Sequence, residues 1–262
     1  MEYKTITYNK HDSVGDITFN RPEIHNAFNA TLLNEMSDLF DRLENDDSLR
    51  VVVITGAGKS FCAGADLNWM RSVVDQSFEE NLTESNNLAD LFYKIYSFKR
   101  PVIGKINGAA IGGGTGFVAV CDIAIAAESA KFSFSEVKIG VVPACIGPYV
   151  IRKLGEGKAR ELFITGERMT AERACSVGLL NMTVPDEKLD EAVDRLVTSI
   201  LSSGPNAVKM AKELVSNVPL MTPEQFKPYT AEMIARLRLS DEGQEGMNAF
   251  LNKRKPSWTK DV

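Results

Sequence analysis

The chain has 262 residues, a net charge of −5 and a sequence pI near 5.3, a length that suits one α/β unit with an additional helical part. An acidic chain without a basic stripe is not expected to bind nucleic acid, and no apolar run is long enough to predict a membrane partner. The four cysteines lack zinc-ligand spacing and the N-terminus lacks a signal-peptide pattern, so we expect a cytoplasmic protein with reduced thiols and no bound metal.

The first part of the chain reads as a β-hairpin, a helix and a buried strand. Polar and apolar residues alternate over residues 3–8 and 14–19, with turn residues between the two segments, which predicts the hairpin. Apolar residues at helical spacing follow Asn29 and end near Leu43. Residues 50–55 then predict a buried strand, and the pattern of residues 78–98 predicts a second helix.

Residues 101–142 organise the chain, because a strand-like run, a glycine cluster, a small-residue segment and an apolar run at residues 122–127 follow one another. This order predicts strand, glycine turn, helix and strand. Gly112, Gly113 and Gly114 leave their backbone amides open to a ligand, and a helix that begins there adds its positive dipole end. The stretch therefore predicts a site for negative charge, although a flexible turn would use the same glycines.

A second small-residue loop occupies residues 61–67, just after the strand predicted at residues 50–55. Each loop leaves the carboxyl end of a strand. If the two loops converge, each would donate one N–H group to the same oxygen atom, which is the arrangement of an oxyanion hole.

The remainder of the chain is mainly helical. Short helices are predicted over residues 143–154 and 158–165, another between Thr170 and Gly178, and a strand over residues 179–184. From about Gly204 the pattern is helical to the end of the chain. We therefore predict a mixed α/β core at residues 1–203 and a helical region at residues 204–262. Without a GxGxxG turn after the first strand, a dinucleotide fold is not expected.

Three motifs in order, FCAGADL, NGAAIGGGTGFVAVCDIAIA and FSFSEVKIGVVP, resemble those of the enoyl-CoA hydratase/isomerase (crotonase) family. The resemblance extends from residue 17 to residue 254. It implies an α/β fold built as a spiral of β-β-α units, with C-terminal helices that pack into homotrimers or homohexamers. It also implies an acyl-CoA thioester substrate and no separate cofactor, since coenzyme A is part of that substrate.

The resemblance assigns roles to three catalytic positions. The amides of Ala65 and Gly113 would hold the thioester oxygen and stabilise the enolate. Glu136 would carry the proton, and its neighbours Phe134 and Val137 predict a partly desolvated carboxyl with a raised pKa. Without the motif, Glu136 would read as a surface residue on an alternating strand.

Gly116 is the fourth catalytic position that the resemblance assigns, and it departs from the hydratase pattern, in which a second glutamate at this position helps to hold water. Isomerases of the family often use only the glutamate that matches Glu136. The segment from Gly140 to Tyr149 nevertheless resembles bacterial methylglutaconyl-CoA hydratases, which also have a small residue at the position of Gly116. Water would then be held by Glu136 with help from the adjacent helix, where Asn86, Asn87 and Asp90 are candidates unless they form a solvated face.

The resemblance also assigns substrate-binding positions at both ends of the chain. The residues expected to contact coenzyme A are His25, Ala27, Ala63, Asp66, Leu67, Phe250 and Lys253. His25 stands where relatives have a more basic residue, and Arg21 is expected to be structural.

Three functions remain open from the sequence. The first is an enoyl-CoA hydratase, with 3-methylglutaconyl-CoA as a candidate substrate, and the second is an enoyl-CoA isomerase that uses Glu136 alone. The third is a catalytically silent member of the family that binds coenzyme A or a partner protein.

Overall fold

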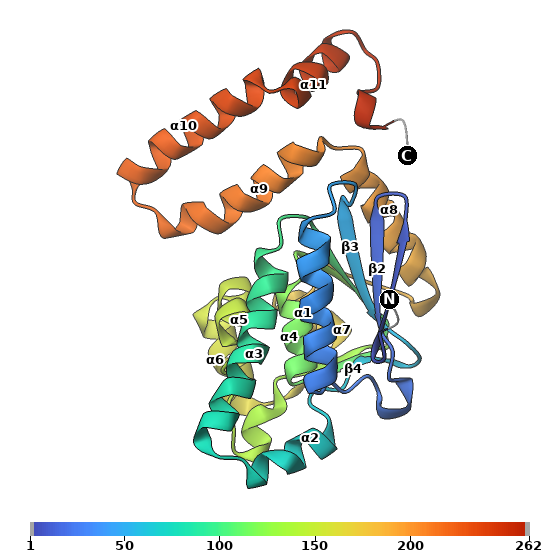
Figure 1. The fold of residues 1–262 in the computed structure, drawn as a ribbon, viewed down its shortest axis with the longest axis vertical. Coiled ribbons are helices and arrows are strands. Elements are labelled where there is room, and N and C mark those ends of the chain that lie inside the picture. Colours follow the sequence, from blue (N-terminus) through green and yellow to red (C-terminus); the bar gives the residue numbers. More distant parts are fainter. Residues whose placement is uncertain (1–2, 260–262) are drawn as a thin grey trace. The chain divides into compact units, whose positions relative to one another are not determined.

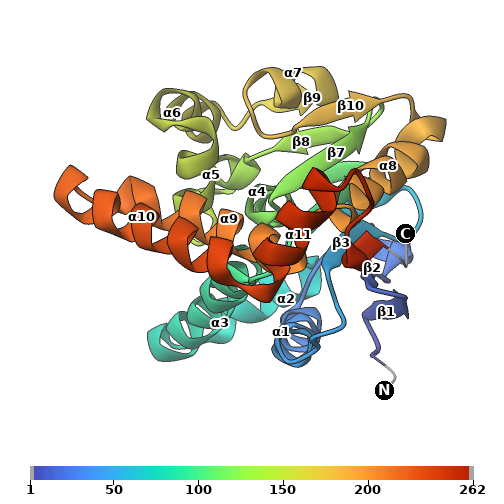
Figure 2. The same ribbon diagram turned by 90° about the horizontal axis from the view of Figure 1, so that it is seen from above.

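The computed structural model describes residues 3–259, which form two compact units (Figure 1 and Figure 2). One unit contains the chain up to Phe98 together with Val102–Val193. The other contains Lys99–Pro101 and continues from Asp194, before the boundary predicted at residue 204. Among residues 3–259, no helix has the length and apolar character that crossing a bilayer requires.

The first unit contains a six-stranded sheet with the order β1-β2-β3-β5-β7-β10. Its strands are β1 (Ile6–His11), β2 (Val14–Phe19), β3 (Val51–Gly56), β5 (Val102–Ile106), β7 (Ile123–Ala127) and β10 (Met182–Val184). β1 and β2 pair antiparallel, which confirms the predicted hairpin, and all other neighbours are parallel. β10 is shorter than the strand predicted over residues 179–184.

A second, four-stranded sheet has the order β4-β6-β8-β9 and was not expected from the sequence pattern. Its strands are β4 (Ser60–Cys62), β6 (Ala109–Ile111), β8 (Lys131–Ser133) and β9 (Arg168–Thr170). Each strand has three residues, too few for a period of two to be recognised. Strands β3, β5 and β7 are each followed by a short strand of the second sheet, so the chain winds as a spiral and the predicted α/β fold class is confirmed.

The α-helices lie between the strands and after the last of them. They are α1 (Ala30–Glu44), α2 (Leu67–Ser72), α3 (Phe78–Ser97), α4 (Gly113–Val120), α5 (Gly147–Leu154), α6 (Glu156–Thr165), α7 (Ala171–Ser176), α8 (Leu189–Leu201), α9 (Pro205–Asn217), α10 (Pro223–Leu239) and α11 (Asp241–Leu251). α1 begins where predicted, because the Asn29 side chain accepts a hydrogen bond from the Leu32 amide. The helix predicted to begin at residue 143 begins only at Gly147.

α4 is held in place by the hydroxyl group of Thr115, which is fully buried. This hydroxyl donates to the Ala110 carbonyl of β6 at 2.6 Å and lies 3.0 Å from the Ser133 carbonyl of β8. A Cβ atom on Gly114 would lie only 2.1 Å from the Cys62 carbonyl oxygen, so α4 can approach β4 only with glycine at this position. The N-terminus of α4 is thereby fixed against three strands of the second sheet.

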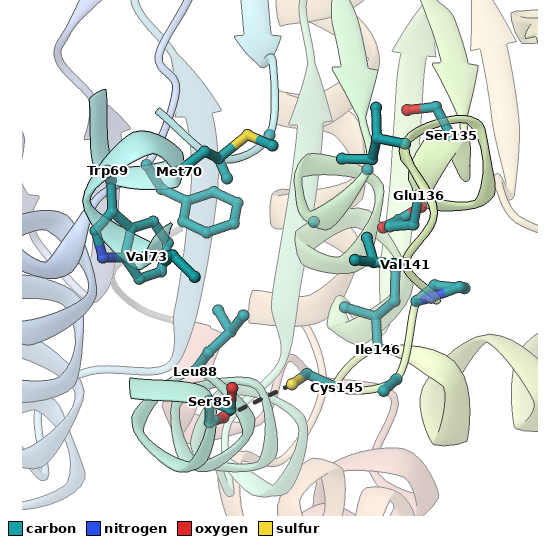
Figure 3. A pocket seen from close by; sticks show the side chains of 18 of the residues that line it. Trp69, Met70, Val73, Ser85, Leu88, Ser135, Glu136, Val141, Cys145 and Ile146 are labelled. Carbon is teal, nitrogen blue, oxygen red and sulfur yellow. Dashed lines mark hydrogen bonds between the residues drawn. The ribbon is translucent and has the colours of Figure 1, made fainter. Parts of the chain in front are cut away.

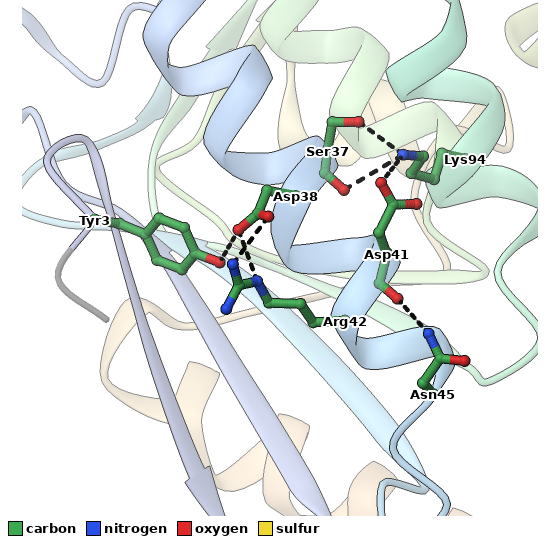
Figure 4. A network of polar contacts seen from close by, with 7 residues as sticks. All are labelled: Tyr3, Ser37, Asp38, Asp41, Arg42, Asn45 and Lys94. Carbon is green, nitrogen blue, oxygen red and sulfur yellow. Dashed lines mark hydrogen bonds and ion pairs between the residues drawn. The ribbon is translucent and has the colours of Figure 1, made fainter.

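α1 and α3 lie side by side in both views (Figure 1 and Figure 2). Figure 4 shows the polar contacts between them, in which the Lys94 ammonium group reaches Asp41 and Ser37, each at 2.7 Å. On the other side of α1, the Tyr3 hydroxyl donates to Asp38, and burial together with this bond raises the pKa of Tyr3 to about 12. Surface pairs of this kind contribute little energy, so apolar packing of α1 against α3 is the main support of α3.

Asn26 joins the segment after β2 to the turn between β3 and β4. Its side chain is completely buried, accepts a hydrogen bond from the Arg21 amide at 2.9 Å, and donates to the Ala57 and Ser60 carbonyls at 2.9 and 2.7 Å. Its φ angle of 57° lies in the left-handed region, which asparagine tolerates better than most residues.

Replacing Asn26 by alanine removes these three hydrogen bonds and leaves buried backbone groups without partners. We expect the Asn26→Ala substitution to lower the free energy of unfolding by about 2–4 kcal/mol, measured by urea denaturation. Asn86→Ala is the matched control, because Asn86 is exposed on α3, and it should change stability by less than about 0.5 kcal/mol. Equal effects of the two substitutions would contradict the role given to Asn26.

Candidate active site

An apolar cavity of about 530 Å³ opens in the first unit. Both small-residue loops line it, with Ala63–Ala65 from one and Ile111–Gly113 from the other. Figure 3 shows Trp69, Met70 and Val73 on one side of the cavity and Glu136, Val141 and Ile146 on the other. The predicted convergence of the two loops is therefore present in the structure.

The amide of Ala65 is left unpaired by the way its loop meets Phe28. The Phe28 amide donates to the Gly64 carbonyl and the Asp66 amide donates to the Phe28 carbonyl, each at 2.8 Å. These bonds use the Gly64 carbonyl before Ala65 and the Asp66 amide after it, but not the Ala65 N–H group. Within residues 3–259, the Ala65 N–H makes no hydrogen bond, and Ala65 lines the cavity.

Gly113 is the first residue of α4, so its N–H has no partner inside the helix. Gly112 precedes it with φ 54° and ψ −126°, a turn that residues with side chains rarely adopt. A Cβ atom on Gly113 would lie 2.7 Å from the Phe28 ring, so the ring fills the space beside the glycine. The positive end of the α4 dipole adds to the effect of the free N–H group.

Glu136 lies in a 3-10 helix, Ser135–Ile139, and not on an alternating surface strand. Its Oε2 atom is buried and has no hydrogen-bond partner among the described residues. Burial raises the pKa of Glu136 above the ordinary value of 4.5, as expected from its apolar neighbours. A Cβ atom on Gly112 would lie 3.5 Å from Oε1, so the carboxyl group lies beside the glycine loop.

Gly116 was named among the catalytic positions, but the structure places it outside the lining of the cavity. It is buried in α4, where a Cβ atom would lie 2.2 Å from Cγ2 of Ile146 and 3.0 Å from the Phe92 ring. Ile146 itself lines the cavity. The space next to position 116 is therefore filled by an isoleucine side chain, and a second carboxylate does not fit there in this packing.

The predicted water-holding residues of α3 point elsewhere. Asn87 and Asp90 line a separate surface hollow with Lys94, and Asn86 is exposed. The positions of α3 that line the cavity are instead Asn81, Glu84, Ser85 and Leu88.

Glu84 is one of the cavity-lining residues of α3 that the sequence patterns did not indicate. Its Oε2 atom accepts a hydrogen bond from the Trp69 indole at 2.9 Å, and its Oε1 atom accepts one from the Gln76 side chain at 3.0 Å. These two bonds connect α3 to the segment that carries the apolar wall. In the sequence, only the helical spacing of Glu84 from the apolar residues of α3 could have placed it on the side of the cavity. That signal is weak, because polar residues occur on several sides of this helix.

The predicted coenzyme A contacts divide into two groups. Ala63 and Leu67 line the cavity. Asp66 does not: its carboxylate pairs with Arg21 at 2.8 Å and accepts a hydrogen bond from the Asn68 amide at the start of α2. Burial works against ionisation of Asp66, but these hydrogen bonds keep its pKa below the ordinary value. Arg21 is structural, as predicted.

The remaining contacts lie outside the lining of the cavity. His25 is exposed, with Nδ1 at 3.0 Å from the Ser60 hydroxyl, and Ala27 is buried, with its carbonyl accepting a hydrogen bond from Arg21. Phe250 and Lys253 belong to the second unit, where Phe250 is 83% exposed. Among residues 3–259, no cluster of histidine, cysteine, aspartate and glutamate suits a metal ion.

Two main-chain amides without a hydrogen-bond partner among residues 3–259 and one desolvated carboxyl group line the same apolar cavity. The family model described as enoyl-CoA hydratase/isomerase matches residues 9–261. The chain therefore belongs to the enoyl-CoA hydratase/isomerase family, and the prediction of the family is confirmed.

Individual relatives agree with this assignment. The crystal structure of an enoyl-CoA hydratase/isomerase (crotonase) family protein from Legionella pneumophila is 46% identical, with a TM-score of 0.93 and coverage of 98% of this chain and 100% of that one. A short-chain-enoyl-CoA hydratase from Clostridium acetobutylicum is 32% identical over 97% of both chains. A trans-2-decenoyl-[acyl-carrier-protein] isomerase from Streptococcus mutans is 30% identical over 99% of both chains.

The raised pKa of Glu136 makes its ionisation unfavourable for the folded state. The protonated carboxyl group is the form that the folded state favours. Its contribution to stability is fully present below the pKa that Glu136 has in the unfolded chain, and it is lost as pH rises through the folded-state pKa. Glu136→Gln cannot ionise, so we expect this variant to be more stable than the wild type at neutral pH, with the difference shrinking toward acid pH. Urea denaturation across this range measures the difference.

Glu128→Gln is the control for this measurement, because Glu128 is an exposed carboxylate outside the cavity. Its effect on stability should not follow the same pH dependence. A constant difference between Glu136→Gln and the wild type at all pH values would show that Glu136 is not desolvated.

Proposed function

We propose that the protein is an enoyl-CoA hydratase that adds water across the 2,3 double bond of an enoyl-CoA thioester. The observation that carries the proposal is the presence of the Ala65 and Gly113 amides and the Glu136 carboxyl group around one cavity. The hydratases among the relatives support it, since they match over nearly the whole chain.

In this mechanism the thioester oxygen accepts hydrogen bonds from the Ala65 and Gly113 amides. As the water oxygen bonds to C3, electrons move through the conjugated system and negative charge develops on the thioester oxygen, where the two amides stabilise it. Glu136 takes the proton that water loses and gives it to C2. One carboxyl group thus serves both proton transfers, which suits a pKa raised toward neutral pH.

The alternative is an enoyl-CoA isomerase, and the lack of a carboxylate at position 116 favours this alternative. With Ile146 filling the space beside Gly116, Glu136 has no carboxylate partner at that position to hold water. In an isomerase, Glu136 would move one proton from C2 to C4, and the same two amides would stabilise the intermediate enolate. The isomerase from Streptococcus mutans among the relatives supports this alternative.

The candidate substrate 3-methylglutaconyl-CoA has an acyl chain that ends in a carboxylate. The described lining of the cavity contains hydroxyl and amide donors in Ser85 and Asn81, but no lysine, arginine or histidine. Crotonyl-CoA, which has an uncharged chain, is therefore the necessary comparison substrate.

The proposal includes assembly into a homotrimer or homohexamer through the second unit. Its helices expose large apolar side chains that a monomer would leave in water, among them Leu239, Phe250 and Leu251. In such an assembly, Phe250 and Lys253 would contact the coenzyme A of a neighbouring subunit.

The proposed function is tested by incubating the protein with crotonyl-CoA, 3-methylglutaconyl-CoA and a 3-enoyl-CoA, and analysing the products by absorbance and mass. Hydration of either 2-enoyl thioester supports the hydratase, whereas double-bond migration without a gain of water supports the isomerase. Glu136→Gln should lower turnover by about 100-fold to 10,000-fold, and Glu128→Gln should not. Tight binding without any turnover would support the catalytically silent alternative.

The oxyanion hole is tested by comparing two variants that both carry a Cβ atom at position 113. The two variants differ in whether the backbone N–H group is present. Proline is accepted at the first position of a helix, so Gly113→Pro deletes the donor while α4 keeps its hydrogen bonds. A Phe28→Leu background makes room for the Cβ atom, and Gly113→Ala in the same background is the matched control. We expect kcat of the proline variant to be about 100-fold to 1,000-fold below that of the alanine variant. Equal rates would exclude the Gly113 amide as a donor.

A further inference from the structure

Lys153 is a half-buried lysine in the last turn of α5 that the proposed mechanism does not use. Its ammonium group donates a hydrogen bond to the Cys121 carbonyl at 2.7 Å and lies 3.4 Å from the Val118 carbonyl. Both carbonyls belong to the C-terminal end of α4. The opposite end of this helix is Gly113, which lines the cavity.

The environment of α4 makes a charge at its C-terminus effective. Gly114–Val120 is entirely buried, so water does not screen the two ends of the helix from each other. An eight-residue helix is about 12 Å long. The Lys153 ammonium group would lie slightly farther than this from the thioester oxygen. At an effective dielectric constant near 20, removing its unit charge would change the rate by about fivefold to tenfold.

The position of Lys153 is unfavourable for a charged group, and the contacts around it compensate only in part. Burial lowers the pKa of Lys153, while Cys121 and Asp122 act in the opposite direction. The Asp122 carboxylate accepts a hydrogen bond from the Val102 amide at 2.7 Å. The hydrogen bonds of the ammonium group are made instead to carbonyls at the negative end of α4.

We propose that Lys153 is a positioning residue for the reaction, whose positive charge neutralises the C-terminal end of α4 and thereby strengthens the field of the Gly113 amide on the thioester oxygen. The inference rests on the proposed function of the cavity. Lys153 does not contact the substrate in this proposal, because its charge acts on the thioester oxygen through the dipole of α4.

Three substitutions separate charge from hydrogen bonding. Lys153→Arg keeps both, Lys153→Gln keeps a donor without the charge, and Lys153→Met removes both. Lys158→Met is the control, because it removes a lysine charge from the surface of α6, where Lys158 pairs with Glu161.

The decisive measurement is the carbonyl stretching frequency of bound butyryl-CoA, isotope-labelled at the thioester carbonyl and read by difference infrared spectroscopy. This saturated thioester cannot be hydrated, so the readout does not require turnover. In the wild type, polarisation by the two amides should lower the frequency on binding. We expect Lys153→Met and Lys153→Gln to lose part of this shift, and Lys153→Arg and Lys158→Met to retain it.

Turnover supplies the second readout. For Lys153→Gln and Lys153→Met, kcat should fall about fivefold to tenfold with KM within a factor of about two, since the interaction is strongest with the charge of the transition state. If Lys153→Met does not fold, Lys153→Gln against Lys153→Arg still tests the charge.

The outcomes distinguish this inference from the proposed function. An unchanged carbonyl frequency in the two neutral variants, with only a loss of stability, would overturn the role of Lys153 and leave a structural cap. A wild-type protein that binds butyryl-CoA without any frequency shift would instead contradict the oxyanion hole itself.

Discussion

The structure of the site depends on where α4 begins. The Thr115 hydroxyl holds the first turn of this helix against β6 and β8, and glycine at position 114 allows the helix to approach β4. These contacts bring the Gly113 amide to the same cavity as the Ala65 amide, although the two residues are far apart in the chain. Because neither of the two proposed donors is a side chain, the geometry of the site is a property of the backbone and of the two sheets that hold it.

Under the proposed function, Glu136 trades stability for reactivity. A buried carboxyl oxygen without a hydrogen-bond partner is unfavourable in the folded protein, and here it lies beside the glycine loop. The same desolvation raises its pKa toward the range in which a carboxyl group both accepts and donates protons. The apolar packing of the surrounding core must offset this cost.

Much of the fold follows from local sequence signals. Asn29 and the apolar residues after it define α1, and the glycine run marks the start of α4. The strands of the second sheet could not be found in this way, because three residues carry no periodicity and their pairing is set by contacts distant in sequence. The motifs identified Ala65, Gly113 and Glu136, all of which line the cavity. They did not reveal Glu84, whose partners are Trp69 in α2 and Gln76 in the segment before α3, or the structural use of Asp66 by Arg21.

The contact between Gly116 and Ile146 limits which side chains position 116 can accept. A carboxylate introduced at position 116 would collide with an isoleucine whose methyl group occupies the space that a Cβ atom needs. The reverse order is also unfavourable, because shortening Ile146 first would leave a void in a packed core. A second carboxylate at position 116 of this chain therefore requires a change at Ile146 as well, so that neither substitution is useful without the other.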